Sequence, residues 1–230
     1  MTSPLFLQQV ERLVALDYPR LLEMDASTFR AALAPLEERI PEEDDIAPDV
    51  EHGVASFVLV IHAPLAPVRV MLPLAERRGK AAIERLFPVQ PEQFQPTSVV
   101  DLPAGHVYLM LDIDRGKDIL NVTPDAALEL LIELGRSPLT MEEGVALLTH
   151  FPELLQPNNC FSLLASRCSD KRVPALWLSE GRPKLGWCWA GNSHMAGFGI
   201  LRPTIRRGGP CPAKNRQRTA DDVNGLHAHH

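Results

Sequence analysis

The first forty residues carry apolar side chains at the spacing of amphipathic helices. Ser3 can cap a helix that begins at Pro4, since the first helical position needs no amide proton. The apolar side chains that follow share one helical face: Phe6, Val10, Leu13 and Val14. Pro19 predicts the start of a second helix, and Asp25 or Ser27 can cap a third. Residues 1–40 are therefore predicted to form an N-terminal helical segment.

The stretch PEEDDIAPDVE, residues 41–51, interrupts this pattern with six carboxylates and two prolines. It offers almost nothing to bury, and its like charges repel one another. Residues 41–52 are therefore predicted to be a solvated acidic linker. The alternative is an acidic segment that docks a partner or binds a cation.

Two apolar runs then predict β-strands. VASFVLVIH, residues 54–62, is rich in β-branched and aromatic side chains and is typical of a central strand. GHVYLMLDID, residues 105–114, predicts a second strand. Between them, PLAERRGKAAIERLF (73–87) favours a helix or a turn followed by a helix, and Gly79 counts against a continuous one.

Two later segments carry helix start signals. Thr123 stands before Pro124 and an apolar periodic run that Gly135 ends. Thr140 is followed three residues later by Glu143, which is the spacing of a capping box. We therefore expect helices after Thr123 and after Thr140.

The last apolar pattern predicts antiparallel strands. CFSLLASR, residues 160–167, alternates apolar and small polar residues, and RVPALWLS and RPKLGWCW flank the turn dipeptide Glu180-Gly181. A two-residue loop pairs Leu176 with Leu185 and Trp177 with Lys184. A three-residue loop would turn every side chain to the opposite face. The shorter loop is favoured.

These elements predict an α+β fold, in which N-terminal helices are followed by a mixed sheet with a C-terminal antiparallel hairpin. Residues 53–194 are expected to form the α+β domain. No internal repeat of 20 to 50 residues is visible.

Charge and composition narrow the possible partners. The net charge is −6, and residues 1–194 alone carry 17 basic and 27 acidic side chains. A body this acidic would repel a phosphate backbone, so no nucleic-acid partner is expected. The chain has no apolar run long enough for a membrane span, and its first residues lack the basic lead of a signal peptide. We expect a cytoplasmic protein that does not bind membranes.

The common catalytic and cofactor motifs are absent from the sequence, so no cofactor is expected. The four cysteines show no C-x-x-C spacing that would indicate zinc. Asp112, Asp114 and Asp118 resemble the start of a calcium loop, but Lys117 occupies the glycine position and Thr123 replaces the bidentate glutamate. A charged loop is favoured over calcium, and no metal site is predicted.

The stretch 172–194 holds all three tryptophans of the chain and is the best candidate for a site. Its candidate binding residues offer aromatic, cationic and amide groups: Trp177, Lys184, Trp187, Trp189 and Asn192. Its candidate catalytic residues would form a nucleophile, a base and a carboxylate: Cys188, His194 and Asp170. The competing interpretation, which we favour, is that the indoles mainly seal an apolar core or interface.

The runs LNVTPDAALELL, SPLTMEEGVALLTHFPELL, NNCFSLLASRC and RVPALWLSEGRPKLGWCWAGN resemble an uncharacterised bacterial family, found mainly in actinobacteria and classed as a domain of unknown function. The resemblance covers about residues 53–194, and it implies no activity, cofactor or catalytic residue.

That family resemblance ends where the hairpin does. Members continue with a short ending that contains Thr-Trp-Leu-Gly-Ser-Ala-Ser-Cys, whereas His194 is followed here by MAGFGILRPTIRRGGPCP. A one-base shift after His194 turns the codons of Met195 and Ala196 into a tryptophan codon. Residues 195–230 are therefore predicted to be a disordered tail produced by a frameshift, natural or from sequencing.

We expect an uncharacterised cytoplasmic binding or interaction domain without recognisable catalytic machinery, whose partner is an unknown protein or small molecule. The alternative is a small hydrolase or transferase that uses Cys188 and His194.

Overall fold

The structure is a computed structural model of the 230-residue chain, and it describes residues 3–41, 46–62, 64–105, 107–116, 119, 121–192, 196–198, 200–201 and 206–208. The α-helices are α1 (Pro4–Ala15), α2 (Tyr18–Leu21), α3 (Ala26–Leu33), α4 (Val68–Met71), α5 (Pro124–Glu133) and α6 (Met141–His150). Short 3-10 helices cover Ala34–Arg39, Leu72–Leu74, Pro91–Gln93 and Pro152–Leu154. The longer strands are β1 (Val54–Ile61), β6 (Val107–Asp114), β8 (Cys160–Ser162), β10 (Arg172–Ser179) and β11 (Arg182–Trp189). The shorter strands are β2 (Glu76–Arg77), β3 (Lys80–Ala81), β4 (Ile83–Glu84), β5 (Gln95–Pro96), β7 (Ser137–Pro138), β9 (Ser166–Arg167), β12 (Ala196–Phe198), β13 (Ile200–Leu201) and β14 (Arg206–Gly208).

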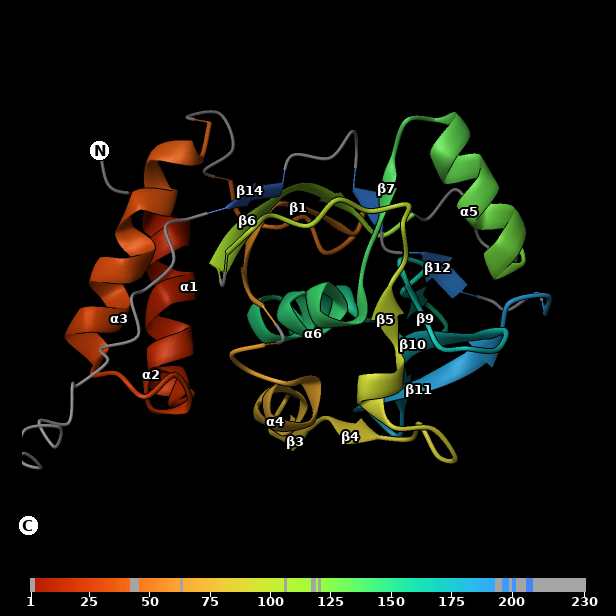
Figure 1. Ribbon diagram of the computed structural model, residues 1–230, viewed down its shortest axis with the longest axis horizontal. Helices are drawn as coiled ribbons and strands as arrows, with labels where there is room; N and C mark the ends of the chain where they lie inside the picture. The colour runs from red at the N-terminus through yellow and green to blue at the C-terminus, as the bar shows by residue number, and fades with distance from the viewer. Residues whose placement is uncertain are drawn as a thin grey trace, which may run out of the picture.

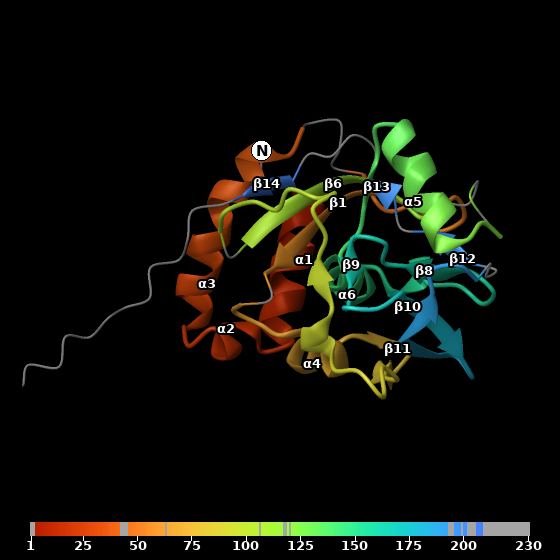
Figure 2. The ribbon, with the colours of Figure 1, turned by 45° about the vertical axis from the view of Figure 1, so that its right-hand side comes forward.

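Two five-stranded sheets enclose the central helix α6, and the predicted α+β fold is confirmed (Figure 1, Figure 2). The first sheet has the order β1-β6-β13-β7, with β14 also paired to β6. The second has the order β12-β8-β10-β11-β4. The N-terminal helices α1 and α3 lie beside the first sheet, at the left of Figure 1. One apolar core joins them to both sheets and to α6, so the N-terminal helices pack on the rest of the protein.

The sequence signals for helix starts are confirmed. Ser3 Oγ accepts the amide proton of Phe6 at 3.0 Å at the start of α1. Asp25 caps α3 by accepting from the amides of the next turn. Thr140 and Glu143 form the predicted capping box at the start of α6. Each bond satisfies an amide that the helix itself leaves without an acceptor.

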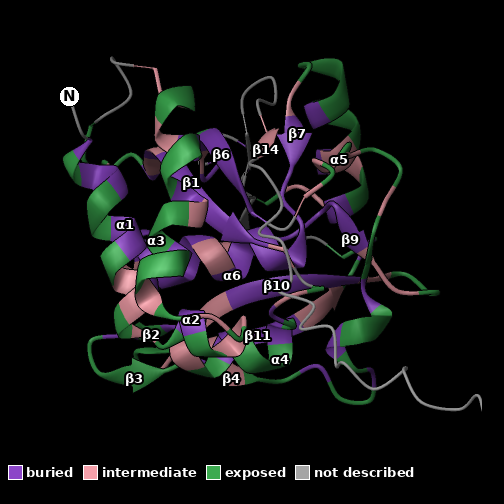
Figure 3. Ribbon diagram, turned by 60° about the vertical axis from the view of Figure 1, so that its left-hand side comes forward, coloured by how far each residue is buried: buried purple, intermediate pink, exposed green. Residues whose placement is uncertain are grey.

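Helix α6 is buried along almost its whole length, between β1 and β6 on one side and β10 on the other (Figure 3). The close approach at Gly144 shows how tightly it is held, since an added Cβ would lie 2.4 Å from Leu163 Cδ2. A helix in this position must bury its polar side chains too, so each of them needs a partner.

Two of these polar side chains bond to backbone. Thr149 Oγ1 donates to the Val145 carbonyl at 2.8 Å. His150 Nε2 lies 3.1 Å from the Leu59 carbonyl oxygen. Burial, with a smaller contribution from the charge of Arg12, lowers the pKa of His150 to about 3, so the ring is neutral and donates this bond.

The outer edge of β1 is paired by a side chain of α1. Gln9 Nε2 donates to the Phe57 carbonyl at 3.1 Å, and Gln9 Oε1 accepts from the Leu59 amide at 2.9 Å. The amide thus supplies the two bonds that a neighbouring strand would make. This contact fixes α1 against the sheet.

The hairpin has the predicted two-residue register, with Leu176 opposite Leu185 and Trp177 opposite Lys184. Glu180 and Gly181 have φ values of 56° and 72°, as a type I′ turn requires at both central residues. Leu176 and Leu185 point into the main core. The alternate residues therefore point to the opposite face of the sheet.

That opposite face is partly covered by α5, over a second and smaller apolar core. Its buried members come from α5, the hairpin and the segments beside them: Ile119, Ala127, Leu131, Leu164, Val173 and Ala190. The rest of this face is the part of the sheet that carries the pocket described below.

The helix predicted within residues 73–87 is wrong. This segment forms a 3-10 turn and the strands β2, β3 and β4. Arg78 and Gly79 form a tight turn with φ values of 50° and 75°, which reverses the chain where a helix would continue. Strand β4 then pairs in parallel with β11, so this segment completes an edge of the second sheet.

Three short segments of the predicted tail are described, and each of them forms a strand. Strands β12, β13 and β14 add to the two sheets, and Arg206 in β14 is buried against Glu143 of α6. Arg206 Nε and Nη2 lie 2.6 and 3.0 Å from the Glu143 carboxylate oxygens. Burial acts against the charge of Arg206, but Glu143 outweighs it and the pKa of Arg206 is raised. The other residues of 195–230 lie outside the described residues, and the frameshift stays a prediction.

The acidic linker is described in part. Residues 42–45 lie outside the described residues, and the predicted linker stays a prediction there. Asp49 forms a β-bridge with Val54, and the Val50 carbonyl accepts from Gln156 Nε2 at 2.9 Å. No helix among the described residues is long and apolar enough to cross a membrane.

We predict that Gln9→Leu lowers the free energy of unfolding by about 2–4 kcal/mol, because two backbone groups of β1 lose their partners in a buried place. Urea unfolding measures the change. The control is Gln8→Leu on the exposed side of the same helix, with an expected change below about 0.5 kcal/mol. Equal effects of the two variants would contradict the role of Gln9.

We also predict that Arg206→Met lowers the free energy of unfolding by about 3–5 kcal/mol, because the Glu143 carboxylate would stay buried without its cation. Adding Glu143→Gln should recover part of this loss. The control is Arg207→Met, whose guanidinium makes an exposed bond to the Arg39 carbonyl. If Arg206→Met unfolds at the same urea concentration as Arg207→Met, the tail does not pack as described.

Candidate functional site

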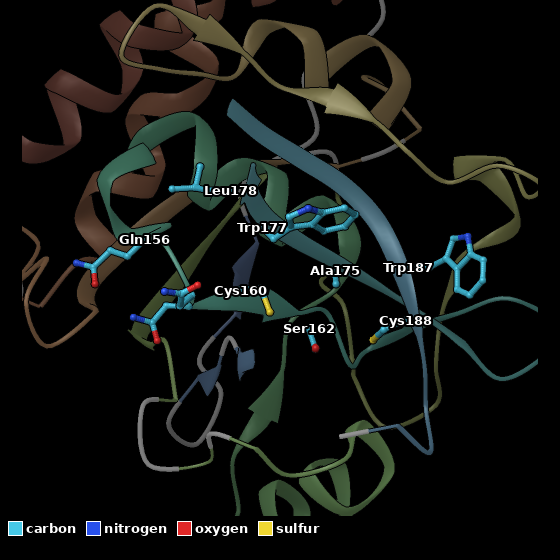
Figure 4. Close-up of a pocket in the computed structure, with 10 residues that line it drawn as sticks. Gln156, Cys160, Ser162, Ala175, Trp177, Leu178, Trp187 and Cys188 are labelled. Atoms are coloured by element: carbon cyan, nitrogen blue, oxygen red, sulfur yellow. The ribbon is translucent and has the colours of Figure 1, made fainter. Parts of the chain in front are cut away.

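A hollow of about 370 Å³ opens on the face of the second sheet that points away from α6, and we call it the hairpin pocket (Figure 4). It lies over β8, β10 and β11 and extends to the turn before β8. Its lining residues are Gln156, Asn158, Asn159, Cys160, Ser162, Ala175, Trp177, Leu178, Trp187 and Cys188. None of these side chains carries a full charge at neutral pH, and the pKa values of both thiols are raised.

The indole of Trp177 forms one wall of the hairpin pocket. It lies over Gly186 of the neighbouring strand, where an added Cβ would come within 2.3 Å of Trp177 Cη2. Glycine at this position therefore lets the ring lie down on the sheet. The hairpin register places Ala175 opposite Gly186, and these two small residues leave the space that the pocket occupies.

Ser162 lies on the floor of the pocket, between Cys160 and Cys188 in Figure 4. It is 1% exposed, and its Oγ has no hydrogen-bond partner among the described residues other than the Cys188 sulfur, which is a weak acceptor. Antiparallel pairing sets Ser162 opposite Ala175, so its side chain must point to the pocket face. A buried hydroxyl without a good partner is unfavourable, and a molecule in the pocket could supply one.

Two thiols flank this hydroxyl. Burial raises the pKa of Cys160 to about 11. Burial also raises the pKa of Cys188, although Ser162 and Arg167 act in the opposite direction. Both groups are therefore thiols at neutral pH, and the charge of Arg167 is not enough to make Cys188 a thiolate.

Side-chain amides border the pocket where the chain turns into β8. Gln156 and Asn159 form an isolated β-bridge, and Asn158 has a φ of 60° at the tip of this turn. Asparagine tolerates this left-handed conformation better than most residues. The turn thus places amide donors and acceptors beside the indole wall.

The opposite face of the hairpin carries an aromatic cluster around a cation. The guanidinium of Arg172 lies 4.5 Å from the ring centre of Trp187 and 5.0 Å from that of Trp189. The two rings meet edge to face at 5.0 Å. Arg172 also forms an ion pair with Asp170, which accepts from Cys168 Sγ at 2.8 Å. Trp187 Nε1 donates to the Leu86 carbonyl at 3.1 Å.

The structure places two of the five binding residues suggested by the sequence in the hairpin pocket. Trp177 and Trp187 line the hairpin pocket, whereas Lys184, Trp189 and Asn192 do not. The cation–π contacts of the described residues involve Arg172 with Trp187 and Trp189. Trp177 and Trp187 are half-buried and Trp189 is 41% exposed, so these indoles seal the interior less fully than expected.

The candidate catalytic residues do not form a described triad. Cys188 lines the pocket, whereas Asp170 is bound to Cys168 and Arg172, whose guanidinium lies over the indoles of the other face. His194 lies outside the described residues. Among the residues that the structure describes, no three His, Cys, Asp or Glu side chains converge as metal ligands would.

Sequence reasoning missed Ser162, Cys160 and the asparagines of the turn. The favoured register already places Ala175, Trp177 and Cys188 on one face of the hairpin, so that part of the pocket was accessible. The position of β8 beside β10 could not be predicted, because no local signal specifies which strands become neighbours.

The fold and the pocket define an α+β domain with a hollow on one face of its antiparallel hairpin. The chain belongs to the family described as a family of unknown function (DUF5701), whose model matches residues 12–200. The match begins inside α1, so the family model includes the end of α1, the helices α2 and α3, and residues 53–194. Neither the curated proteins nor the solved structures include a match to this chain.

We predict that Cys160 and Cys188 react slowly with iodoacetamide at pH 7, and that their rates rise about tenfold per pH unit up to pH 9, because burial keeps them as thiols. Mass spectrometry of the peptides gives the rate at each cysteine. The same cysteines in the urea-unfolded chain serve as the control and should react faster. If Cys188 reacts faster at pH 6 in the folded chain than in the urea-unfolded chain, it is instead an activated nucleophile.

Proposed function

We propose that this protein is a cytoplasmic binding domain whose hairpin pocket holds a small, uncharged, ring-shaped molecule with hydrogen-bonding groups at its edge. The observation that carries the proposal is the buried Ser162 hydroxyl, which lines the pocket and lacks a good partner among the described residues. A ligand that bonds to it removes the cost of leaving this group unsatisfied.

The size and chemistry of the pocket support this class of ligand. A volume of about 370 Å³ lies within the range of small-molecule sites. The Trp177 indole offers a flat apolar surface on which a ring can stack. Amides and a hydroxyl can bond to a polar ring edge, whereas the uncharged lining offers no counter-charge to an ionic ligand.

A second candidate function is docking of a protein partner on the aromatic cluster of the opposite face. Trp189 is 41% exposed and stacks on Arg172, and Phe87, beside Trp187, is 85% exposed. Tryptophan and arginine are enriched among the residues that contribute most to protein interfaces. The two functions would use two sites of one hairpin that share Trp187.

The alternative of a hydrolase or transferase has weaker support. A cysteine nucleophile needs a lowered pKa, whereas that of Cys188 is raised by burial. Its proposed carboxylate, Asp170, forms an ion pair with Arg172 instead.

We predict that neutral ring compounds bind in the hairpin pocket and quench tryptophan fluorescence. The probes are methyl β-glucopyranoside and adenine, with glucuronate and adenosine monophosphate as their charged counterparts. Ser162→Ala should weaken binding of a neutral probe about threefold to tenfold, through the loss of one hydrogen bond. Ala175→Leu, which fills the pocket, should abolish it.

Ser179→Ala is the matched control, since Ser179 is on β10 but does not line the pocket. Tighter binding of the charged probes, or unchanged binding in Ser162→Ala, would contradict the proposal.

A further inference from the structure

Helix α6 carries four buried polar side chains: Glu142, Glu143, Thr149 and His150. Thr149 and His150 bond to backbone carbonyls, and Glu143 is paired with Arg206. Glu142 is 9% exposed, and among the described residues no lysine or arginine pairs with it. Its carboxylate has the Thr140 hydroxyl and a backbone amide as partners. A buried carboxylate normally needs a cation as well.

The carboxylate of the adjacent residue, Glu143, is buried too, and its charge and hydrogen-bonding capacity are compensated by several partners. It receives two bonds from Arg206, one from the Tyr108 hydroxyl at 3.1 Å and one from the Thr140 amide at 2.8 Å. Burial raises the pKa of Glu142, and the neighbouring charge of Glu143 contributes to the rise. The difference between the two carboxylates lies in the cation that only Glu143 has among the described residues.

Glu142 lines a second hollow, of about 270 Å³, whose lining residues come in part from α4, β5 and the start of α6. Most of its wall is apolar, with four prolines, Val68, Phe94 and Met141. His62 also lines it, and its ring lies 6.2 Å from that of Tyr108. The other carboxylate of this hollow, Glu92, is exposed and bonded to Arg69 at 2.6 and 2.7 Å.

An apolar wall with one buried carboxylate favours a ligand that carries a positive charge. An anion would face the Glu142 carboxylate across an apolar space and be repelled. A neutral molecule would gain the apolar contacts alone. An organic cation would gain the same contacts and would also supply the missing counter-charge, with a charge-assisted hydrogen bond to Glu142. The apolar wall suits the carbon body of such a ligand.

We infer that this hollow is a binding site for a small organic amine, whose ammonium group pairs with Glu142 while its apolar body lies against Phe94 and the prolines. The site is separate from the hairpin pocket and does not depend on the function proposed for it. The class of ligand is a primary amine on an apolar or aromatic group.

The experiment uses the full chain and three probes of the same shape: benzylamine, benzyl alcohol and benzoate. Titration calorimetry should give binding of benzylamine that is tighter than that of the other two. Glu142→Gln should weaken it about tenfold or more, since a hydrogen bond to a charged group is lost. The matched control Glu129→Gln should change it less than about twofold, because Glu129 is an exposed carboxylate of α5 that lines neither hollow.

Two further measurements locate benzylamine at Glu142. Ser162→Ala, in the hairpin pocket, should leave benzylamine binding unchanged, so failure of one site does not affect the other. In the wild-type chain, labelled with ¹³C at glutamate carboxyls, benzylamine should move the Glu142 signal towards its ionised position, which tests the contact even if Glu142→Gln fails to fold. Equal binding of benzyl alcohol, full binding in Glu142→Gln, or an unmoved Glu142 signal would overturn the inference.

Discussion

Helix α6 is buried between two sheets although its sequence, MEEGVALLTH, contains four polar side chains and a capping threonine just before it. Removing these groups from water is costly unless each one finds a partner. Much of the surrounding structure can be understood as meeting this requirement. The carbonyl of Leu59 in β1 accepts from His150, and the strand β14 brings Arg206 to Glu143. The second hollow lies beside Glu142, the one carboxylate of the helix without a cation among the described residues.

The hairpin imposes a second constraint through its register. A two-residue turn at Glu180 and Gly181 sends Leu176 and Leu185 into the core and leaves Trp177 and Cys188 on the outer face. The three tryptophans therefore do different work. Trp177 forms a wall of the pocket, Trp189 packs on the guanidinium of Arg172, and Trp187 contacts Arg172 and also lines the pocket.

The sequence was most informative where structure depends on near neighbours. The capping box at Thr140 and the hairpin register are set within a few residues, and both were predicted correctly. The helix predicted within residues 73–87 was wrong because the composition of this segment favours a helix, whereas Arg78 and Gly79 form a two-residue turn. Contacts between distant segments left no local pattern: Arg206 reaches Glu143 across 63 residues, from a stretch with the composition of a disordered tail. The register likewise gave one side of the hairpin pocket, whereas Ser162 entered from β8, whose neighbour in the sheet could not be deduced.

The ion pair of Arg206 also bears on the order in which the protein can fold as it is made. A ribosome synthesises the chain from the N-terminus onward, so Glu143 leaves the ribosome 63 residues before Arg206, which neutralises it. Until then the nascent domain must either leave the start of α6 in water or bury a carboxylate alone. The Glu143 ion pair can therefore form only after β14, the last described strand, has been synthesised. A chain stalled before β14 would be a target for chaperones.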